Sequence, residues 1–84
     1  MTKGEILESL DKIIGEIVEV DDLKLTREST AEDVDGWDSV AHVNILIAIE
    51  ATFGIRFDAE EIGSLSSVGV LIDMIDLKLG QTTA

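Results

Sequence analysis

Apolar residues recur at the three- and four-residue spacing of an α-helical face in several segments of this chain. The clearest case is residues 3–18, where one face would carry Ile6, Leu10, Ile13, Ile14 and Ile17. Charged side chains fall on the rest of this segment, so one side suits a core and the other suits water. The sequence therefore predicts a first amphipathic helix over residues 3–18.

A second helix is predicted over residues 39–53, because residues 40–53 contain neither Gly nor Pro and Gly54 follows as a typical helix-ending residue. Its core face would be formed by His42, Ile45, Leu46, Ile49 and Phe53. A second stripe, turned away from that face, consists of Val40, Asn44, Ile47 and Ala51. A surface helix normally carries charge on such a stripe, and this one carries none.

Between the first two helices, residues 21–38 form a connection that is long for so small a chain. Apolar side chains within it should hold it against the core, namely Leu23, Leu25 and Val34. A short third helix is predicted over residues 58–63, because Asp58 and Glu61 are spaced as a capping box.

The fourth helix should begin after a cap at Ser66 or Ser67 and reach about Leu79. Its core face would be formed by Val68, Leu71, Ile72, Ile75 and Leu79. Gly69 should weaken this helix by about 1 kcal/mol relative to alanine. Residues 80–84 are expected to form a frayed tail.

These elements predict an all-α fold, a four-helix bundle with three longer helices, a short third helix and a long loop between the first two. Eighty-four residues are enough for one domain, which we expect to span residues 1–84. The chain has no Cys, so no disulfide or thiolate metal site reinforces the fold.

Eighteen acidic residues against six basic ones give the chain a formal charge of −12. Such a charge disfavours nucleic acid and anionic membranes as partners and favours basic patches on other proteins. The longest apolar run, residues 45–49, is too short to span a bilayer, and the first residues lack the apolar stretch of a signal peptide. We therefore expect a soluble, cytoplasmic monomer.

The most informative segment is Asp38-Ser39, which stands at the start of the second helix just after Gly36 and Trp37. Helix N-termini present unpaired N–H groups and a positive dipole end, so a phosphate attached to Ser39 would be stabilised there. The simpler interpretation is that Asp38 or Ser39 only caps the helix.

Other chemistries fit the sequence less well. An EF-hand register that places Gly36 at the sixth position would put Ala31 and His42 where carboxylate ligands are required, so no metal site is predicted. Ser39 and His42 lack a recognisable oxyanion-hole loop, which disfavours a hydrolase. Trp37 is expected to pack over the first turn of the second helix against His42, and the alternative is that it shapes the approach to Ser39.

Residues 35–40, Asp-Gly-Trp-Asp-Ser-Val, together with residues 53–57, Phe-Gly-Ile-Arg-Phe, resemble the acyl carrier protein family. The resemblance covers nearly the whole chain, including the long loop and the third helix. It implies that 4′-phosphopantetheine is attached to Ser39 by a separate, magnesium-dependent transferase, with Asp38 and Gly36 presenting the serine. The protein would be a carrier rather than an enzyme, holding acyl groups as thioesters for fatty-acid or polyketide-type biosynthesis.

The family's second helix is usually acidic, whereas here Glu50 is its only acidic residue. The resemblance therefore implies a partner surface of mixed character, formed by Val40, Val43, Asn44, Ile47, Glu50 and Ala51. Electrostatic steering would come from Asp35, Asp38, Glu60 and Glu61. The expected partners are the phosphopantetheinyl transferase, an acyl-loading ligase or transferase, and synthase enzymes with basic docking patches.

By the same resemblance, the acyl chain would enter a cavity between the second and third helices, near Val43, Leu46, Phe57 and Ile62. A hydrophobic chain favours such burial by about 0.8 kcal/mol per methylene. Two alternatives remain: an aminoacyl or D-alanyl carrier with the same fold and modified serine, and an unmodified acidic interaction domain.

Overall fold

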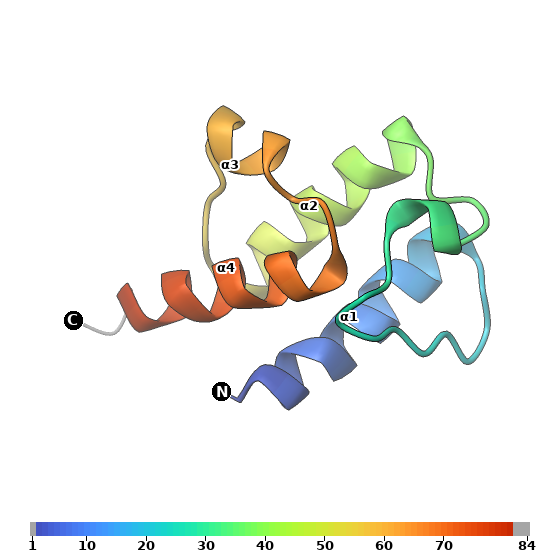
Figure 1. Ribbon diagram of the computed structural model, residues 1–84, viewed down its shortest axis with the longest axis horizontal. Coiled ribbons are helices and arrows are strands. Elements are labelled where there is room, and N and C mark those ends of the chain that lie inside the picture. Colours follow the sequence, from blue (N-terminus) through green and yellow to red (C-terminus); the bar gives the residue numbers. More distant parts are fainter. Residues whose placement is uncertain (1, 82–84) are drawn as a thin grey trace.

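The apolar faces of the longer helices meet in one core in the computed structural model, which describes residues 2–81 (Figure 1). Its elements are α1 (Lys3–Val18), the short 3₁₀ helix η1 (Ala31–Asp33), α2 (Ser39–Phe53), α3 (Ala59–Gly63) and α4 (Val68–Gln81). The four predicted α-helices and the long loop between the first two are confirmed. The 3₁₀ turn within that loop was not predicted, and no strand occurs in residues 2–81.

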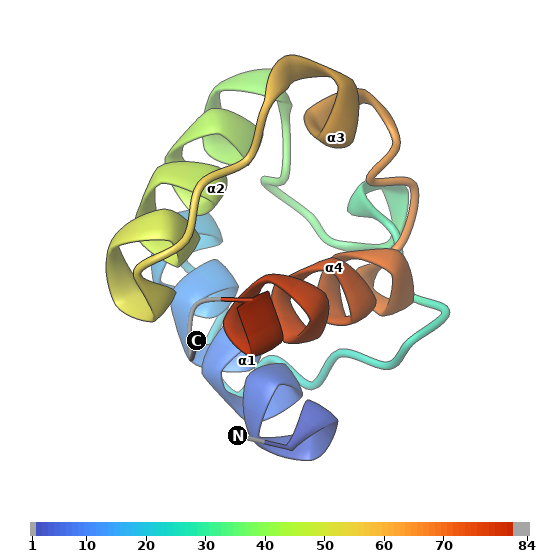
Figure 2. The same ribbon diagram turned by 90° about the vertical axis from the view of Figure 1, so that its left-hand side faces the viewer.

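Helix α1 contacts both α2 and α4, so it joins the two other long helices (Figures 1 and 2). Ile6, Leu10 and Ile14 are fully buried at this junction. The predicted core faces of α2 and α4 are also buried for the most part, through Ile45, Leu46, Ile49, Val68, Leu71, Ile72 and Ile75. Each of these faces follows helical spacing, so burying them in one core holds the helices together without disulfides.

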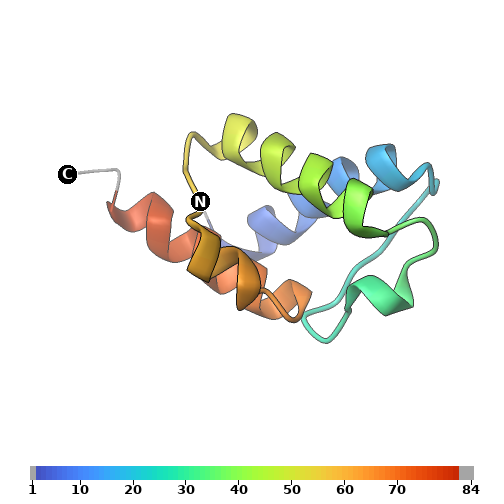
Figure 3. The same cartoon turned by 90° about the horizontal axis from the view of Figure 1, so that it is seen from above.

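The long connection is ordered by contacts to both α1 and α4. Leu25 and Val34 are buried, as predicted, and the Leu25 N–H donates to Asp11 of α1 at 2.8 Å. At the other side, the Ser29 carbonyl accepts the Val68 N–H at 2.8 Å. The connection is therefore held against both α1 and the start of α4, and it lies at the right of Figures 1 and 3.

Helix α4 begins as predicted but ends two residues later than predicted. Ser67, one of the two predicted caps, lies at its start, and its hydroxyl accepts the Val70 N–H at 3.3 Å. The helix continues to Gln81, so Gly80 and Gln81 are helical instead of belonging to a frayed tail. The remaining tail residues, 82–84, lie outside the described residues. None of the helices in residues 2–81 combines the length and apolar character needed to cross a bilayer.

Gly69 occupies a close contact that helix propensity does not reveal. Its N–H donates to the Arg27 carbonyl at 2.8 Å, and a Cβ added at Gly69 would lie 2.9 Å from that oxygen. The Arg27 guanidinium also pairs with Asp73 of α4 through two bonds of 3.1 and 3.0 Å. The glycine thus lets the long connection approach the start of α4.

Candidate functional site

Ser39 is the first residue of α2, and Asp38 caps the helix immediately before it. The Asp38 carboxylate accepts the Ala41 N–H at 2.8 Å, while its carbonyl accepts the His42 N–H at 2.9 Å. The capping interpretation is therefore correct for Asp38. Ser39 is left exposed, and no other residue in 2–81 forms a hydrogen bond with its hydroxyl.

Backbone donors at this helix start are also available. Within the described range, the N–H groups of Ser39 and Val40 have no hydrogen-bond acceptor, because Asp38 serves only Ala41 and His42. These amides lie at the positive end of the α2 dipole beside the exposed hydroxyl. A phosphate bonded to Ser39 would meet donors rather than acceptors, so the chemistry of this position fits a phosphodiester.

Gly36 is required by the local geometry. It has φ of +87°, and a Cβ at this position would approach the Val18 carbonyl oxygen to 3.2 Å. A residue with a side chain would be strained there both by its backbone and by the end of α1. Gly36 therefore allows the connection to turn against α1 just before Ser39, a reason that the sequence interpretation did not give.

Trp37 packs against His42, as predicted. The two rings are stacked with centroids 6.1 Å apart, and the indole Nε1–H donates to His42 Nδ1 at 3.1 Å. This contact ties the residue before the cap to the second turn of α2. It also occupies one ring nitrogen of His42, which removes that atom as a base for Ser39 and weakens a hydrolase interpretation further.

The outward stripe of α2 is exposed and apolar. Val40, Val43 and Ile47 are 71%, 55% and 58% exposed, and Asn44 and Ala51 are exposed beside them. Glu50 behaves differently, because it is half-buried and its carboxylate accepts the Phe57 N–H at 2.9 Å. The acidic residue of this helix therefore holds the loop that leads to α3.

Two of the four acidic residues predicted to steer partners are engaged within the protein. Asp38 caps α2, and Glu61 accepts both the Asp58 N–H at 2.9 Å and the Lys78 ammonium at 2.8 Å. The hydrogen bond from Lys78 is the largest cause that lowers the pKa of Glu61. Asp35 and Glu60 remain exposed, with no bonding partner in residues 2–81.

The residues predicted to line an acyl cavity between α2 and α3 differ in how deeply they are buried. Leu46 and Phe57 belong to the core, with exposures of 6% and 9%, whereas Ile62 is 38% exposed and Val43 is 55% exposed. The Lys78 ammonium lies 5.7 Å from the centre of the Phe57 ring and covers that side chain. Leu46 and Phe57 are thus packed with other core residues.

A cavity of about 60 Å³ lies beside the Ser39 segment. It is lined by Thr30, Ala31, Trp37, His42, Leu65, Ser66, Ser67, Val68 and Leu71. Trp37 and His42 flank Ser39 in the sequence, while the other residues come from the long connection and the start of α4. No pattern in the sequence indicates this grouping, because it depends on how the connection and α4 meet.

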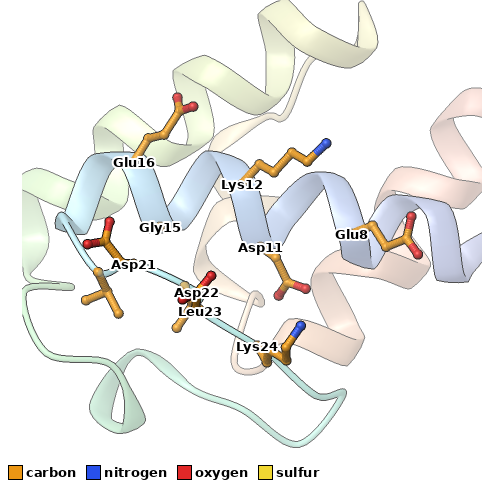
Figure 4. Close-up of a pocket in the computed structure, with 10 residues that line it drawn as sticks. Glu8, Asp11, Lys12, Gly15, Glu16, Asp21, Asp22, Leu23 and Lys24 are labelled. Carbon is orange, nitrogen blue, oxygen red and sulfur yellow. The ribbon is translucent and has the colours of Figure 1, made fainter.

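A larger depression of about 540 Å³ lies between α1 and the first residues of the connection (Figure 4). Figure 4 shows that acidic side chains, among them Glu8, Asp11 and Asp21, line much of it, with Lys12 and Lys24 nearby. None of residues 35–40 contributes to it. In residues 2–81, no group of three or more His, Cys, Asp or Glu side chains is arranged to hold a metal ion.

The known proteins that are similar to this chain include several acyl carrier proteins. The chain is 32% identical to an acyl carrier protein of Thermotoga maritima, over 94% of the chain and 98% of that protein. It is 34% identical to an acyl carrier protein of Thermosynechococcus vestitus, again over 94% and 98%. No protein-family model matches the chain.

Among solved structures, a holo acyl carrier protein of Geobacter metallireducens superposes with a TM-score of 0.85 at 36% identity, covering 92% of this chain and 88% of that one. The crystal structure of an acyl carrier protein from Thermotoga maritima gives a TM-score of 0.83 at 25% identity, covering 95% and 93%.

Proposed function

The chain belongs to the acyl carrier protein family, and we propose that Ser39 is the residue that bears its 4′-phosphopantetheine arm. The observation that supports this assignment is the exposed, unbonded hydroxyl at the first residue of α2. When bound, the prosthetic group supplies the thiol on which acyl groups are held as thioesters. This protein acts as the carrier, and a separate transferase makes the attachment.

The residues around Ser39 would orient and stabilise the attachment. Asp38 caps α2 by accepting the Ala41 N–H, which fixes the start of the helix. The serine hydroxyl therefore projects from a defined position. The free N–H groups of Ser39 and Val40 can donate to phosphate oxygens. Gly36 lets the chain turn tightly against α1, and Trp37 holds the same segment from the other side through His42.

We further propose that Val40, Val43, Asn44, Ile47 and Ala51, here called the α2 outer face, contact the enzymes that act on the arm. This face adjoins Ser39, and its exposed apolar residues would be covered by an enzyme seated over the serine. A second copy of the chain is a poor occupant, because two proteins of charge −12 repel each other. Asp35 and Glu60 are the exposed acids best able to steer basic partners, and Glu50 contributes by holding the loop to Phe57.

Mass spectrometry after incubation with coenzyme A, magnesium and a broad-specificity phosphopantetheinyl transferase tests the assignment of Ser39. We expect one phosphopantetheine adduct on the native protein, none on Ser39→Ala, and an unchanged adduct on Ser64→Ala, a matched exposed serine. An unmodified native protein, or an adduct that persists in Ser39→Ala, would refute the assignment.

The identity of the enzyme that loads the arm distinguishes the remaining cargo classes. We favour acyl cargo for fatty-acid or polyketide-type synthesis, carried by a cytoplasmic monomer. Loading by an amino-acid-activating ligase, and not by acyl-transferring enzymes, would favour the aminoacyl or D-alanyl alternative.

A further inference from the structure

We infer that the enzymes seated on the α2 outer face present a carboxylate to Arg56, an exposed cation that borders this face. The inference rests on the proposed function, because it takes both the arm on Ser39 and the α2 outer face as given. It adds the chemistry of the partner, whose docking surface would combine an apolar centre with an acidic group at this one point.

Arg56 differs from the other basic residues in its surroundings. Three of those residues form ion pairs within the protein, namely Lys3, Arg27 and Lys78. Two more, Lys12 and Lys24, line the depression in Figure 4 together with several acidic side chains. Arg56 is exposed and forms no hydrogen bond or ion pair with any residue in 2–81. Its charge is therefore available to a partner.

The backbone on both sides of Arg56 is fixed. Ile55 and Phe57 are buried in the core, and the Phe57 N–H donates to the Glu50 carboxylate at 2.9 Å. The Ile55 N–H also donates to the Glu50 carbonyl, at 3.2 Å. Arg56 thus extends into solvent from a position that the core and α2 together determine.

The neighbouring acidic residues leave the guanidinium of Arg56 unpaired. Asp58 uses its carboxylate to cap α3, where it accepts the Glu61 N–H at 2.8 Å. Glu60 is exposed, but its carboxylate is not bonded to Arg56. A partner that covers this region therefore meets a cation as well as a free acid, rather than an acidic surface alone.

The bond to Glu50 places Arg56 beside the α2 outer face. Glu50 lies three residues after Ile47 and seven after Val43, so these side chains share one flank of α2. Because Phe57 is bonded to Glu50, the residue just before it lies along the same flank. Figure 2 shows the segment between α2 and α3 running back along α2.

An enzyme that reaches Ser39 also covers Arg56. Ser39 and Glu50 are eleven residues apart on α2, so about 17 Å separates them along the helix axis. One side of a typical protein interface covers about 800 Å², which is a patch about 30 Å across. An interface of this size, seated over Ser39 and the α2 outer face, has Arg56 near its rim.

A carboxylate is the group that complements Arg56 at this rim. A charged side chain that is covered without an opposite charge loses hydration, and a basic group facing it adds repulsion. The chain as a whole has a charge of −12 and attracts basic surfaces. Arg56 therefore discriminates among such surfaces, because it favours those with an acidic group at this point over those that are uniformly basic.

Kinetics with a panel of phosphopantetheinyl transferases tests this inference. Each transferase is assayed with coenzyme A and magnesium on the native protein, Arg56→Glu and Arg56→Lys, at about 50 mM NaCl. For the transferase with the highest kcat/KM on the native protein, Arg56→Glu should lower kcat/KM by about three- to tenfold, mainly through KM. Arg56→Lys, which keeps the charge, should retain most of the native value. At about 0.5 M NaCl the loss should disappear, because exposed charges are screened.

Lys24→Glu is the matched control. Like Arg56→Glu, it replaces an exposed cation by an acid and changes the net charge by the same amount, but no residue of α2 lines the depression in which Lys24 lies. Lys24→Glu should change kcat/KM by less than about twofold. Circular dichroism of each variant verifies that the fold is retained, so a change in KM can be attributed to docking.

The outcomes separate this inference from the two proposals on which it rests. A native protein that no transferase modifies would refute the attachment at Ser39, and a native KM for Ile47→Glu would refute the α2 outer face. If Ile47→Glu raises KM but Arg56→Glu leaves kcat/KM unchanged or raises it, the assignment of Arg56 alone is overturned. A native dimer in analytical ultracentrifugation that Arg56→Glu dissociates would also overturn it, because Arg56 would then serve a contact between two copies.

Discussion

For the replacement of Gly69 by alanine, helix propensity predicts a gain in stability, whereas tertiary packing predicts a loss. Near the start of an exposed helix, Gly→Ala stabilises by up to about 1 kcal/mol. At Gly69 the new Cβ would lie 2.9 Å from the Arg27 carbonyl oxygen and 3.2 Å from the Arg27 Cβ. The first of these atoms is backbone, so the long connection itself must move.

The cost of that movement exceeds the gain in propensity. Overpacking of this kind costs about 1–3 kcal/mol, and weakening the 2.8 Å bond from the Gly69 N–H to the Arg27 carbonyl adds about 0.5–1.5 kcal/mol. After subtraction of the propensity gain, we expect Gly69→Ala to destabilise the protein by about 0.5–3.5 kcal/mol. For a domain of this size, each kcal/mol lowers Tm by about 4–8 °C.

Gly4→Ala provides a matched control, because Gly4 is the second residue of α1 as Gly69 is of α4. A Cβ at Gly4 would meet only the Thr2 hydroxyl oxygen, at 3.8 Å. Urea unfolding followed by circular dichroism at fixed salt should show Gly4→Ala unchanged or more stable by up to about 1 kcal/mol. The packing argument is refuted if both variants gain stability to the same extent.

Three further predictions concern charge and the α2 outer face. The hydrogen bond from Arg27, followed by that from Lys3, lowers the pKa of Asp73 from 3.8 to about 2. A carboxyl group with a lowered pKa stabilises the fold above its unfolded pKa, so the stability difference between the native protein and Asp73→Asn should shrink as the pH falls from about 4 to 2; an acid titration that shows a constant difference would contradict this. Ile47→Glu should raise the KM of the transferase several-fold with little change in kcat, whereas Ile62→Glu should not, and equal KM values would argue against the α2 outer face. Added NaCl or magnesium should raise the Tm by screening repulsion within a chain of charge −12, and an unresponsive Tm would count against this explanation.

Local patterns in the sequence were sufficient to predict most of the fold. The three- and four-residue spacing located the core faces, and Gly54 ends α2 with φ of +68°, as a helix-ending glycine should. The capping box of Asp58 and Glu61 and the contact of Trp37 with His42 were also predicted. In each case the interacting residues lie within five positions of one another, so spacing alone determines which groups can meet.

Features formed by residues distant in the sequence could not be predicted in this way. Gly69 looked like a weakness of α4 until its contact with Arg27 was known, and Glu50 looked like a partner-binding residue although it also holds Phe57. The cavity beside Trp37 depends on the same meeting of the long connection with α4. The spacing of residues within the long connection or within α4 does not indicate how close these two segments lie in the fold.

The structure also indicates where a carrier of this kind is rigid. The connection before Ser39 is fixed to α1 by Leu25 and Gly36, and to α4 by Arg27. Trp37 then joins its last residues to α2. If Ser39 bears the arm, movement of cargo between enzymes has to come from the arm, because the segment that presents the serine is held on three sides. Gly69→Ala, which strains the Arg27 contact, should therefore alter the cavity beside Trp37 as well as the stability, whereas Gly4→Ala should leave the cavity unchanged.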